Sequence, residues 1–147
     1  LHTNDAPGAV VRLIDMGIEP YLLASCLRGV LAQRLARKLC AECKRRIALT
    51  DVDLARLGPL AARLQGRDAW ASAGCPACLE GYRGRTGIFE LMVLDREMQE
   101  RVTRGHAGVD GLRGLAEANG MVSLLADGVA KVLAGVTSLA EVISVAA

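Results

Sequence analysis

Apolar residues recur along this chain in short blocks, and the spacing within each block indicates the element it forms. Asn4-Asp5-Ala6-Pro7 places capping side chains just before a proline, an arrangement that opens many helices. Val10, Leu13 and Ile14 follow at helical spacing. Gly17 is a suitable C-terminal stop, because glycine readily takes the left-handed conformation in which many helices end. The pattern therefore predicts a first helix that ends near Gly17.

A second helix is predicted to begin near Pro20. Its apolar stripe follows helical spacing through Leu22, Leu23, Cys26, Leu27, Val30 and Leu31. On this stripe Cys26 is interpreted as a small buried hydrophobe rather than as a metal ligand. The next segment, Gln33–Leu39, suits either a continued helix or a short strand. We favour the strand, because the CxxC pair that follows needs a sharp turn.

The remaining chain predicts one broken helix, one strand and a run of short helices. Asp51–Gln65 carries leucines at helical spacing and is interrupted near Gly58-Pro59. Gly81–Gly87 is rich in turn residues and predicts a loop, whereas Ile88–Leu94 has strand composition and is expected to pair back onto the sheet. Asp95–Ala147 predicts about four short amphipathic helices. These are separated at Gly105, Gly120 and Gly135, with Asp95, Asp110, Ser123 and Ser138 as N-terminal caps.

Composition narrows the class of protein. The 147 residues are enough for one domain with its own core, and 52% hydrophobic with 23% charged residues is ordinary for a soluble protein. Aromatic residues make up only 3%, so an aliphatic core is expected, which suits helices. The net charge of +2 gives no global argument for nucleic-acid or membrane binding. No apolar run reaches the roughly 18 to 20 residues of a membrane span, and no signal peptide is visible.

Four of the five cysteines form two CxxC pairs, Cys40/Cys43 and Cys75/Cys78. Without a secretory signal a reducing compartment is expected, and paired CxxC turns there favour a metal over disulfides. Four thiolates satisfy tetrahedral Zn²⁺ and leave no position for water, so the predicted zinc site is structural. The intervening residues 44–74 exceed the spacing of about 15 to 20 in compact zinc ribbons, and a structured excursion is expected there.

Two other interpretations of the cysteines stay open. A pair of redox-active dithiols would normally lie at a helix start in a thioredoxin-like βαβ unit, and no such unit is visible in the sequence. The other interpretation is that the cysteines are simply buried.

Several motifs together resemble the secretion ATPase superfamily, which serves type II secretion and type IV pilus assembly. The resemblance covers essentially the whole chain. It rests on the histidine box Leu1–Ala6 with Arg12–Gly17, on Gly29–Leu35, on the two CxxC pairs, on Gly81–Leu91, on Gly120-Met121 and on Gly135–Leu139. The chain most resembles the type II secretion ATPases (general secretory pathway protein E), and the type IV pilus assembly ATPases come second.

This resemblance implies an α/β fold: the end of a RecA-like P-loop ATPase core, an inserted tetracysteine zinc module and a C-terminal helical subdomain. The expected segments are the core portion 1–39, the zinc module 40–80, a return strand 81–94 and the helical subdomain 95–147. The first residue is not Met and lies inside an apparent element, so we expect a fragment of a longer protein. The intact protein would be a cytoplasmic homohexamer, peripheral at the inner membrane, that drives pseudopilus assembly through a membrane-platform protein.

The resemblance assigns nucleotide chemistry mostly to the intact protein. No G-x-x-x-x-G-K-[ST] loop occurs in the chain, so ATP and Mg²⁺ are expected only in the intact protein, and this segment alone is expected to be inactive. His2 matches the histidine of the family's histidine box. Its implied role is support of catalysis, as a hydrogen-bond donor to charge that develops near the γ-phosphate.

Six positive charges lie between Arg34 and Arg46. They form either a solvated face or, through Lys44, Arg45 and Arg46, a contact with anionic lipid or an acidic partner at the membrane. Arg83 and Arg85 lie in the glycine-rich segment after the second CxxC pair. The two arginines could contact a neighbouring subunit or a nucleotide. Alternatively, the glycines of this segment serve only to form a turn.

A zinc-ribbon-like nucleic-acid-binding module is the rival class of function. The near-neutral charge and the scarcity of aromatic platforms weigh against it, so no nucleic-acid partner is expected.

Overall fold

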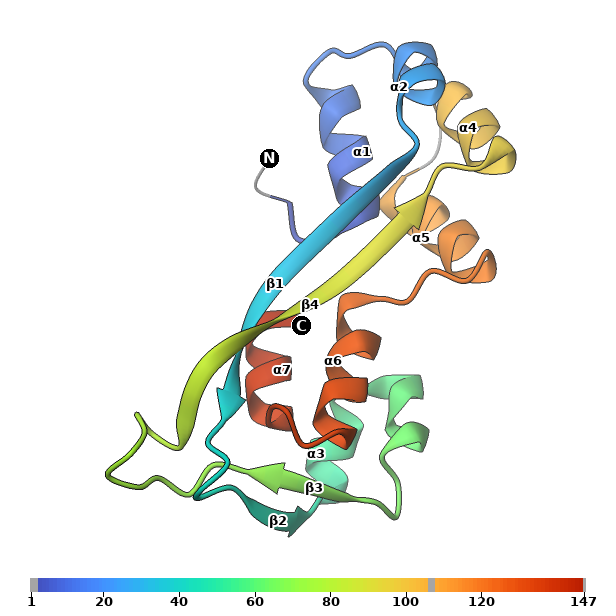
Figure 1. The fold of residues 1–147 in the computed structure, drawn as a ribbon. Coiled ribbons are helices and arrows are strands. Elements are labelled where there is room, and N and C mark those ends of the chain that lie inside the picture. The colour runs from blue at the N-terminus through green and yellow to red at the C-terminus, as the bar shows by residue number, and fades with distance from the viewer. Residues whose placement is uncertain (1–2, 106–107, 147) are drawn as a thin grey trace. The chain divides into compact units, whose positions relative to one another are not determined.

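The computed structural model describes residues 3–105 and 108–146, which mix helices with four strands (Figure 1). The elements in chain order are α1 (Ala6–Asp15), α2 (Pro20–Cys26), β1 (Gly29–Leu39), β2 (Arg45–Ala48), α3 (Asp51–Ala55), the 3₁₀ helix η1 (Gly58–Arg63), β3 (Asp68–Ala71), β4 (Tyr82–Val93), α4 (Arg96–Thr103), α5 (Val109–Ala118), α6 (Leu124–Leu133) and α7 (Leu139–Ala146). β1 pairs with β4, and β2 pairs with β3. Within the described residues no helix is long and apolar enough to cross a membrane.

The chain forms two compact units. The first contains residues 1–33 and 89–123, and the second contains residues 34–88 and 124–147. The predicted segments 1–39, 40–80, 81–94 and 95–147 describe places in a longer protein rather than compact units, and they stay a prediction.

In the first unit, helix α1 begins and ends where the sequence predicts. The carboxylate of Asp5 accepts a hydrogen bond from the Gly8 amide at 2.6 Å, and Pro7 lies in the first turn. Gly17 takes a φ of 89°, which an L-residue adopts only with strain, and the helix stops before it. The core that α1 joins is aliphatic: Ala6, Val10, Leu23, Ala24, Met92, Leu94, Met98, Val102, Leu112 and Ala116.

The second unit is built on the β2–β3 pair and helices α6 and α7. β2 and β3 are antiparallel, with Arg46 opposite Trp70. The excursion between them carries α3 and η1, so the predicted break near Gly58-Pro59 is confirmed. The core of the second unit is again aliphatic: Leu57, Leu64, Ala69, Val129, Val132, Leu139, Val142 and Ile143.

Two strands are longer than predicted. The apolar stripe places Val30 and Leu31 in the second helix, but that helix ends at Cys26 and both residues lie in β1. The predicted loop Gly81–Gly87 is also wrong, because β4 begins at Tyr82 and continues to Val93. Glycine signals a turn only when no neighbouring strand offers hydrogen bonds, and here β1 offers them to β4.

The four C-terminal helices are confirmed, two of their predicted caps are confirmed, one is misplaced, and Ser123 stays a prediction. The Asp95 carboxylate accepts a hydrogen bond from the Met98 amide at 2.8 Å, and Ser138 Oγ accepts one from the Glu141 amide at 3.2 Å. Asp110 is not a cap. It lies in the first turn of α5, and Gly108 is the capping residue.

Candidate metal centre

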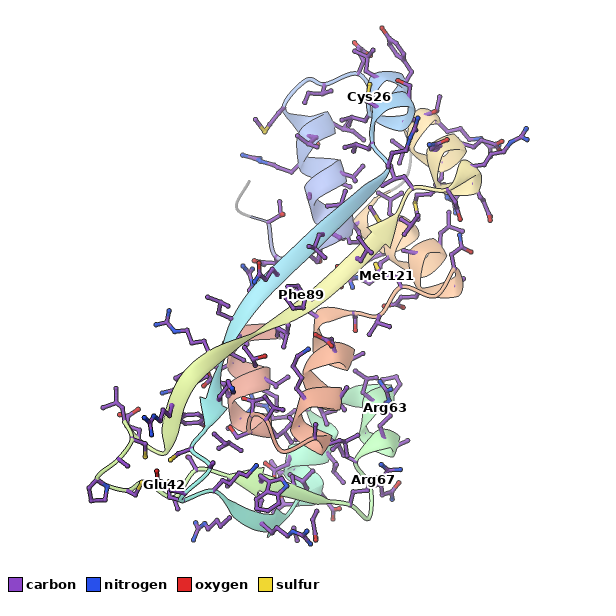
Figure 2. All side chains as sticks on the ribbon, viewed as in Figure 1. Cys26, Glu42, Arg63, Arg67, Phe89 and Met121 are labelled. Atoms are coloured by element: carbon purple, nitrogen blue, oxygen red, sulfur yellow. The ribbon has the colours of Figure 1, made fainter. Side chains whose placement is uncertain are left out.

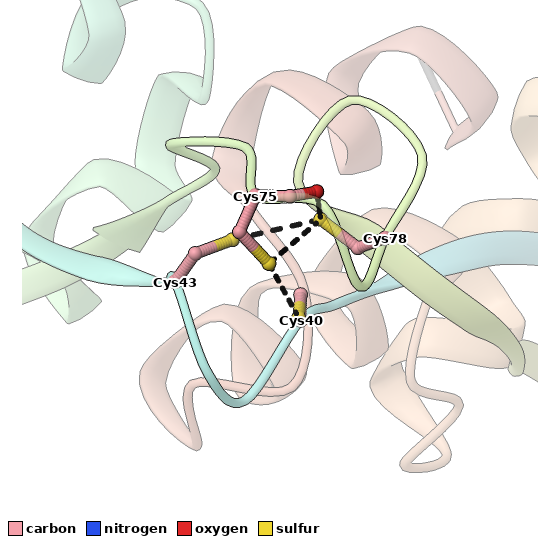
Figure 3. Close-up of side chains that lie close together, drawn as sticks. All are labelled: Cys40, Cys43, Cys75 and Cys78. Atoms are coloured by element: carbon pink, nitrogen blue, oxygen red, sulfur yellow. Dashed lines mark hydrogen bonds between the residues drawn. The ribbon is translucent and has the colours of Figure 1, made fainter.

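The four paired cysteines come from two turns at the ends of strands. Cys40 directly follows β1, and Cys43 lies two residues before β2. Cys75 and Cys78 lie in the connection from β3 to β4. Figure 3 shows the four side chains directed at one another from these two turns. Cys40 is buried and the other three are half-buried, so the backbone has brought together residues 35 positions apart.

The sulfur atoms are spaced as a tetrahedral metal site requires. All four ligand atoms lie within 4.8 Å of one another. The Sγ–Sγ distances are 4.0 Å for Cys40–Cys75, 3.7 Å for Cys43–Cys78 and 3.5 Å for Cys75–Cys78. A Zn–S bond of about 2.3 Å sets the sulfurs of a tetrahedron about 3.8 Å apart, whereas a disulfide needs about 2.05 Å. The four cysteines are free thiols and can hold a metal ion.

The crowding of the sulfurs perturbs their acidity. Burial raises the pKa of Cys43, and its hydrogen bond with Cys78 acts in the same direction. A backbone hydrogen bond with Ala77 lowers the pKa of Cys75, but the neighbouring thiols and burial outweigh it and raise that pKa to about 12. Burial tends to raise the pKa of Cys78, yet its backbone and thiol hydrogen bonds lower it overall. Thiolates repel one another here, and a bound cation removes that penalty.

A backbone bond joins the two cysteine turns. The Cys40 amide donates to the carbonyl oxygen of Gly81 at 2.9 Å. Gly81 has a φ of 83°, and a Cβ there would overlap Cβ of Ser72. Only glycine fits this position. Gly81 thus lets the segment after the second cysteine turn pass close to Ser72, and the Cys40–Gly81 bond links this segment to the first turn.

A charged network that the sequence patterns do not reveal braces the first turn against α7. Glu141 is 7% exposed and accepts three hydrogen bonds from Arg37: from the amide at 2.9 Å, from Nε at 3.0 Å and from Nη2 at 2.8 Å. Arg37 also bonds Glu80 at 3.2 Å, and its guanidinium lies 4.2 Å from the ring centroid of Tyr82. The hydroxyl of Tyr82 reaches that of Ser138 at 2.7 Å. Three bonds onto one buried carboxylate fix α7 beside the end of β1.

Two of the basic residues Lys44, Arg45 and Arg46 make contacts within the second unit. Lys44 is half-buried, donates to the carbonyl oxygen of Gly135 at 2.9 Å and lies 4.8 Å from the ring centroid of Trp70. Arg46 stacks on the same ring at 5.3 Å and pairs with Asp68 at 3.6 Å. Arg45 is exposed. Of the three predicted lipid-contact residues, Lys44 and Arg46 therefore have structural contacts as well.

Arg83 and Arg85 lie on β4 rather than in a loop, and both are exposed. Arg83 lies 3.9 Å from the carboxylate of Glu42, which belongs to the first cysteine turn. His2 lies outside the described residues. The prediction that Cys26 is buried is wrong: it ends α2 and is exposed (Figure 2), because the stripe that suggested burial ceases to be helical after it.

Two buried carboxylates, Glu90 and Glu141, carry ion pairs that the motifs alone do not indicate. Each nevertheless has a visible signal in the sequence. Glu90 alternates with Ile88 and Met92 in a strand, and Glu141 precedes Val142 in an apolar helix. A carboxylate at a core position needs a partner, and both have an arginine.

Comparison with known proteins gives consistent matches over nearly the whole chain. A family model described as "Type II/IV secretion system protein" matches residues 1–144. Type II secretion system protein HxcR of Pseudomonas aeruginosa is 46% identical over 99% of this chain and 27% of its own length. Type II secretion system ATPase E of Vibrio cholerae is 44% identical over 99% of this chain and 28% of its own. Type IV pilus assembly ATPase PilB of Thermus thermophilus is 40% identical over 98% and 16%. The chain thus spans about a quarter or less of these relatives.

Proposed function

The chain belongs to the type II/IV secretion system protein family, and from that premise we propose that it is the C-terminal segment of a cytoplasmic hexameric ATPase. In this proposal the intact protein powers type II secretion by driving pseudopilus assembly at the inner membrane. The observation that carries it is the 44% identity, over 99% of the chain, to a relative named a type II secretion ATPase. Pilus assembly is the second candidate, favoured by the 40% identity to a pilus assembly ATPase.

The experiment compares the full-length protein with the 147-residue chain in ATP hydrolysis. The full-length protein should hydrolyse ATP with Mg²⁺, and the chain should not, since its sequence lacks the phosphate-binding loop. Hydrolysis by the chain at a rate near that of the full-length protein would refute the proposal that nucleotide hydrolysis needs the rest of the protein. Complementation of strains lacking either the secretion ATPase or the pilus assembly ATPase separates the two candidate systems.

The cysteine cluster, Cys40, Cys43, Cys75 and Cys78, is proposed to bind one Zn²⁺. The support is the donor set, with three Sγ–Sγ distances of 3.5 to 4.0 Å and all four sulfurs within 4.8 Å of one another. Bound zinc would supply a cross-link between the two turns and keep all four thiols deprotonated. With four sulfurs the coordination shell is complete, so the role is structural rather than catalytic.

An uncovered apolar face supports the assignment of residues 1–39 and 81–94 to a larger RecA-like core. In the first unit, Leu31, Phe89, Leu91 and Val93 are 59%, 42%, 52% and 59% exposed. The alternate residues Ile88, Glu90 and Met92 are buried. A two-stranded ribbon is marginal in water by itself, and a row of large exposed apolar side chains suits a ribbon that is covered in the intact protein. There His2 would support catalysis near bound ATP and Mg²⁺.

Contacts outside the chain complete the proposal. Arg45 and Arg46 lie exposed on β2 and would meet anionic lipid headgroups or an acidic partner, with Lys44 beside them. Arg83 and Arg85 would serve a subunit interface of the homohexamer or a nucleotide contact. The membrane-platform protein of the secretion system is the expected partner, and anionic lipid is the expected membrane component.

A further inference from the structure

Glu90 ties strand β4 to the first residue of helix α1. Its side chain is 1% exposed, and Oε1 accepts a hydrogen bond from the Ala6 amide at 2.8 Å. The amides at a helix N-terminus have no partner within the helix, and this end of the helix dipole is positive. A buried carboxylate therefore satisfies one of these amides from a residue 84 positions away.

Arg113, on α5, joins Glu90 to the cap of the same helix. Its guanidinium contacts the Glu90 carboxylate at 3.4 Å and the Asp5 carboxylate at 2.5 Å. Asp5 in turn caps α1 through the Gly8 amide. Two consecutive residues, Asp5 and Ala6, are thus fixed by groups from β4 and α5. The Asp5 cap is sufficient to start α1. The additional bonds from Glu90 and Arg113 fix the start of α1 relative to β4.

Asp5 and Ala6 are the last two residues of the Leu1–Ala6 part of the histidine box. His2 precedes Asp5 by three residues, and three residues span at most about 11 Å. We propose that Glu90 and Arg113 are positioning residues for ATP hydrolysis, which hold the backbone at Asp5 and Ala6 and thereby limit where His2 can reach. The inference rests on the proposed function, in which His2 supports catalysis in the intact protein.

The test uses Glu90→Gln in the full-length protein. The variant keeps the shape and one acceptor oxygen but removes the charge that Arg113 contacts. Since the misplacement of a catalytic group by about 1 Å costs on the order of 100-fold in rate, kcat for ATP hydrolysis should fall about 10- to 100-fold. KM for ATP should change less than about 3-fold, because the lost interaction acts on the chemical step rather than on nucleotide binding. Glu117→Gln is the matched control: its carboxylate faces Arg113 at 4.0 Å but is 50% exposed, and both constants should stay within about 2-fold.

A double-mutant cycle with His2→Ala separates positioning from general weakening. If Glu90 acts through His2, Glu90→Gln should lower kcat by less than about 2-fold in the His2→Ala background. An equal fall in both backgrounds would overturn the inference, as would an unchanged kcat in Glu90→Gln. If Glu90→Gln does not fold, Arg113→Lys takes its place, because lysine keeps the charge but cannot hold both carboxylates.

Hydrogen–deuterium exchange of residues 3–10 distinguishes failure of this inference from failure of the proposed function. Exchange there should be faster in Glu90→Gln than in the parent protein or in Glu117→Gln. Unchanged exchange would overturn the inference whatever the activity. If exchange is faster in Glu90→Gln but the parent protein does not hydrolyse ATP, the proposed function fails and the contact at Asp5 and Ala6 stands. If the rate of the parent protein survives His2→Ala, the inference fails, because His2 then has no catalytic role that Glu90 could support.

Discussion

The contact between helices α6 and α7 has room for a glycine and nothing larger. An alanine Cβ at Gly128 would overlap Cγ1 of Val142 and lie 3.2 Å from its Cγ2. Val142 is fully buried, so its side chain has no free space into which to turn. We predict that Gly128→Ala lowers the stability of the second unit, although alanine is the better helix former.

The magnitude follows from two opposing effects. Alanine in place of glycine inside a helix gains about 1 kcal/mol. Carbon atoms prefer a separation of about 3.5 to 4.0 Å, so the helices must move apart by about 1 Å, and overpacking a tight core costs about 2 to 3 kcal/mol. The net loss should be about 1 to 2 kcal/mol, the difference between these two effects. For a chain of this size that lowers Tm by about 3 to 6 °C.

The assay is thermal and denaturant unfolding of four variants: Gly128→Ala, Gly114→Ala, Val142→Ala and the double variant Gly128→Ala with Val142→Ala. Gly114 lies in α5, and a Cβ at this position would meet no atom within 4 Å, so Gly114→Ala should raise stability by about 0.5 to 1 kcal/mol. The double variant Gly128→Ala with Val142→Ala should lose less unfolding free energy than the two single variants lose together, by at least about 1 kcal/mol, because removing the Val142 methyl groups makes room for the new Cβ. If Gly128→Ala raised Tm as Gly114→Ala does, the description of the α6–α7 contact would be wrong.

Two further predictions concern charged groups. Arg45→Glu with Arg46→Glu should abolish binding of the full-length protein to anionic vesicles and lower Tm by no more than about 3 °C, because the Arg46 side chain, which contacts Trp70 and Asp68, is exposed. Lys44 is left intact because its contact with Gly135 is structural, and unchanged binding would refute the lipid contact. Burial would raise the pKa of Glu141, but the hydrogen bonds and charge of Arg37 lower it overall. The ion pair therefore stabilises the fold fully above the ordinary glutamate pKa of about 4.3, and this stabilisation is lost as pH falls through the lower pKa of the folded state. The stability difference between the parent and Glu141→Gln, measured by denaturant unfolding, should therefore shrink below about pH 4, and a difference that grew there would contradict the pairing.

Elements set by neighbouring residues could be predicted from the sequence. Asp5 with Pro7 starts α1, and Asp95 caps α4, because each cap acts within three residues of itself. The strand boundaries could not be predicted in this way. Val30 satisfies both helical and extended spacing, and Gly84 keeps its place in β4 with a φ of 78° because β1 pairs alongside.

The candidate site divides in the same manner. The cysteine cluster was predictable because the spacing within each CxxC pair already specifies a chelating turn, and a metal needs two such turns. The bond from Arg37 to Glu141 was not, since 104 positions separate the two residues and many arginines were available. The sequence shows only a carboxylate next to Val142 in an apolar helix, and the fold determines which cation pairs with it.

X-ray absorption at the zinc edge reports whether the cysteine cluster is a closed zinc site. The purified protein should contain about one Zn²⁺ per chain with four sulfur neighbours at about 2.3 Å. Cys26→Ser should leave both values unchanged, because Cys26 is exposed and is not one of the four clustered cysteines, whereas Cys75→Ser should lose the metal or a sulfur ligand. A folded protein that contains no zinc, or zinc bound by oxygen and nitrogen, would mean that the four cysteines do not form a zinc site.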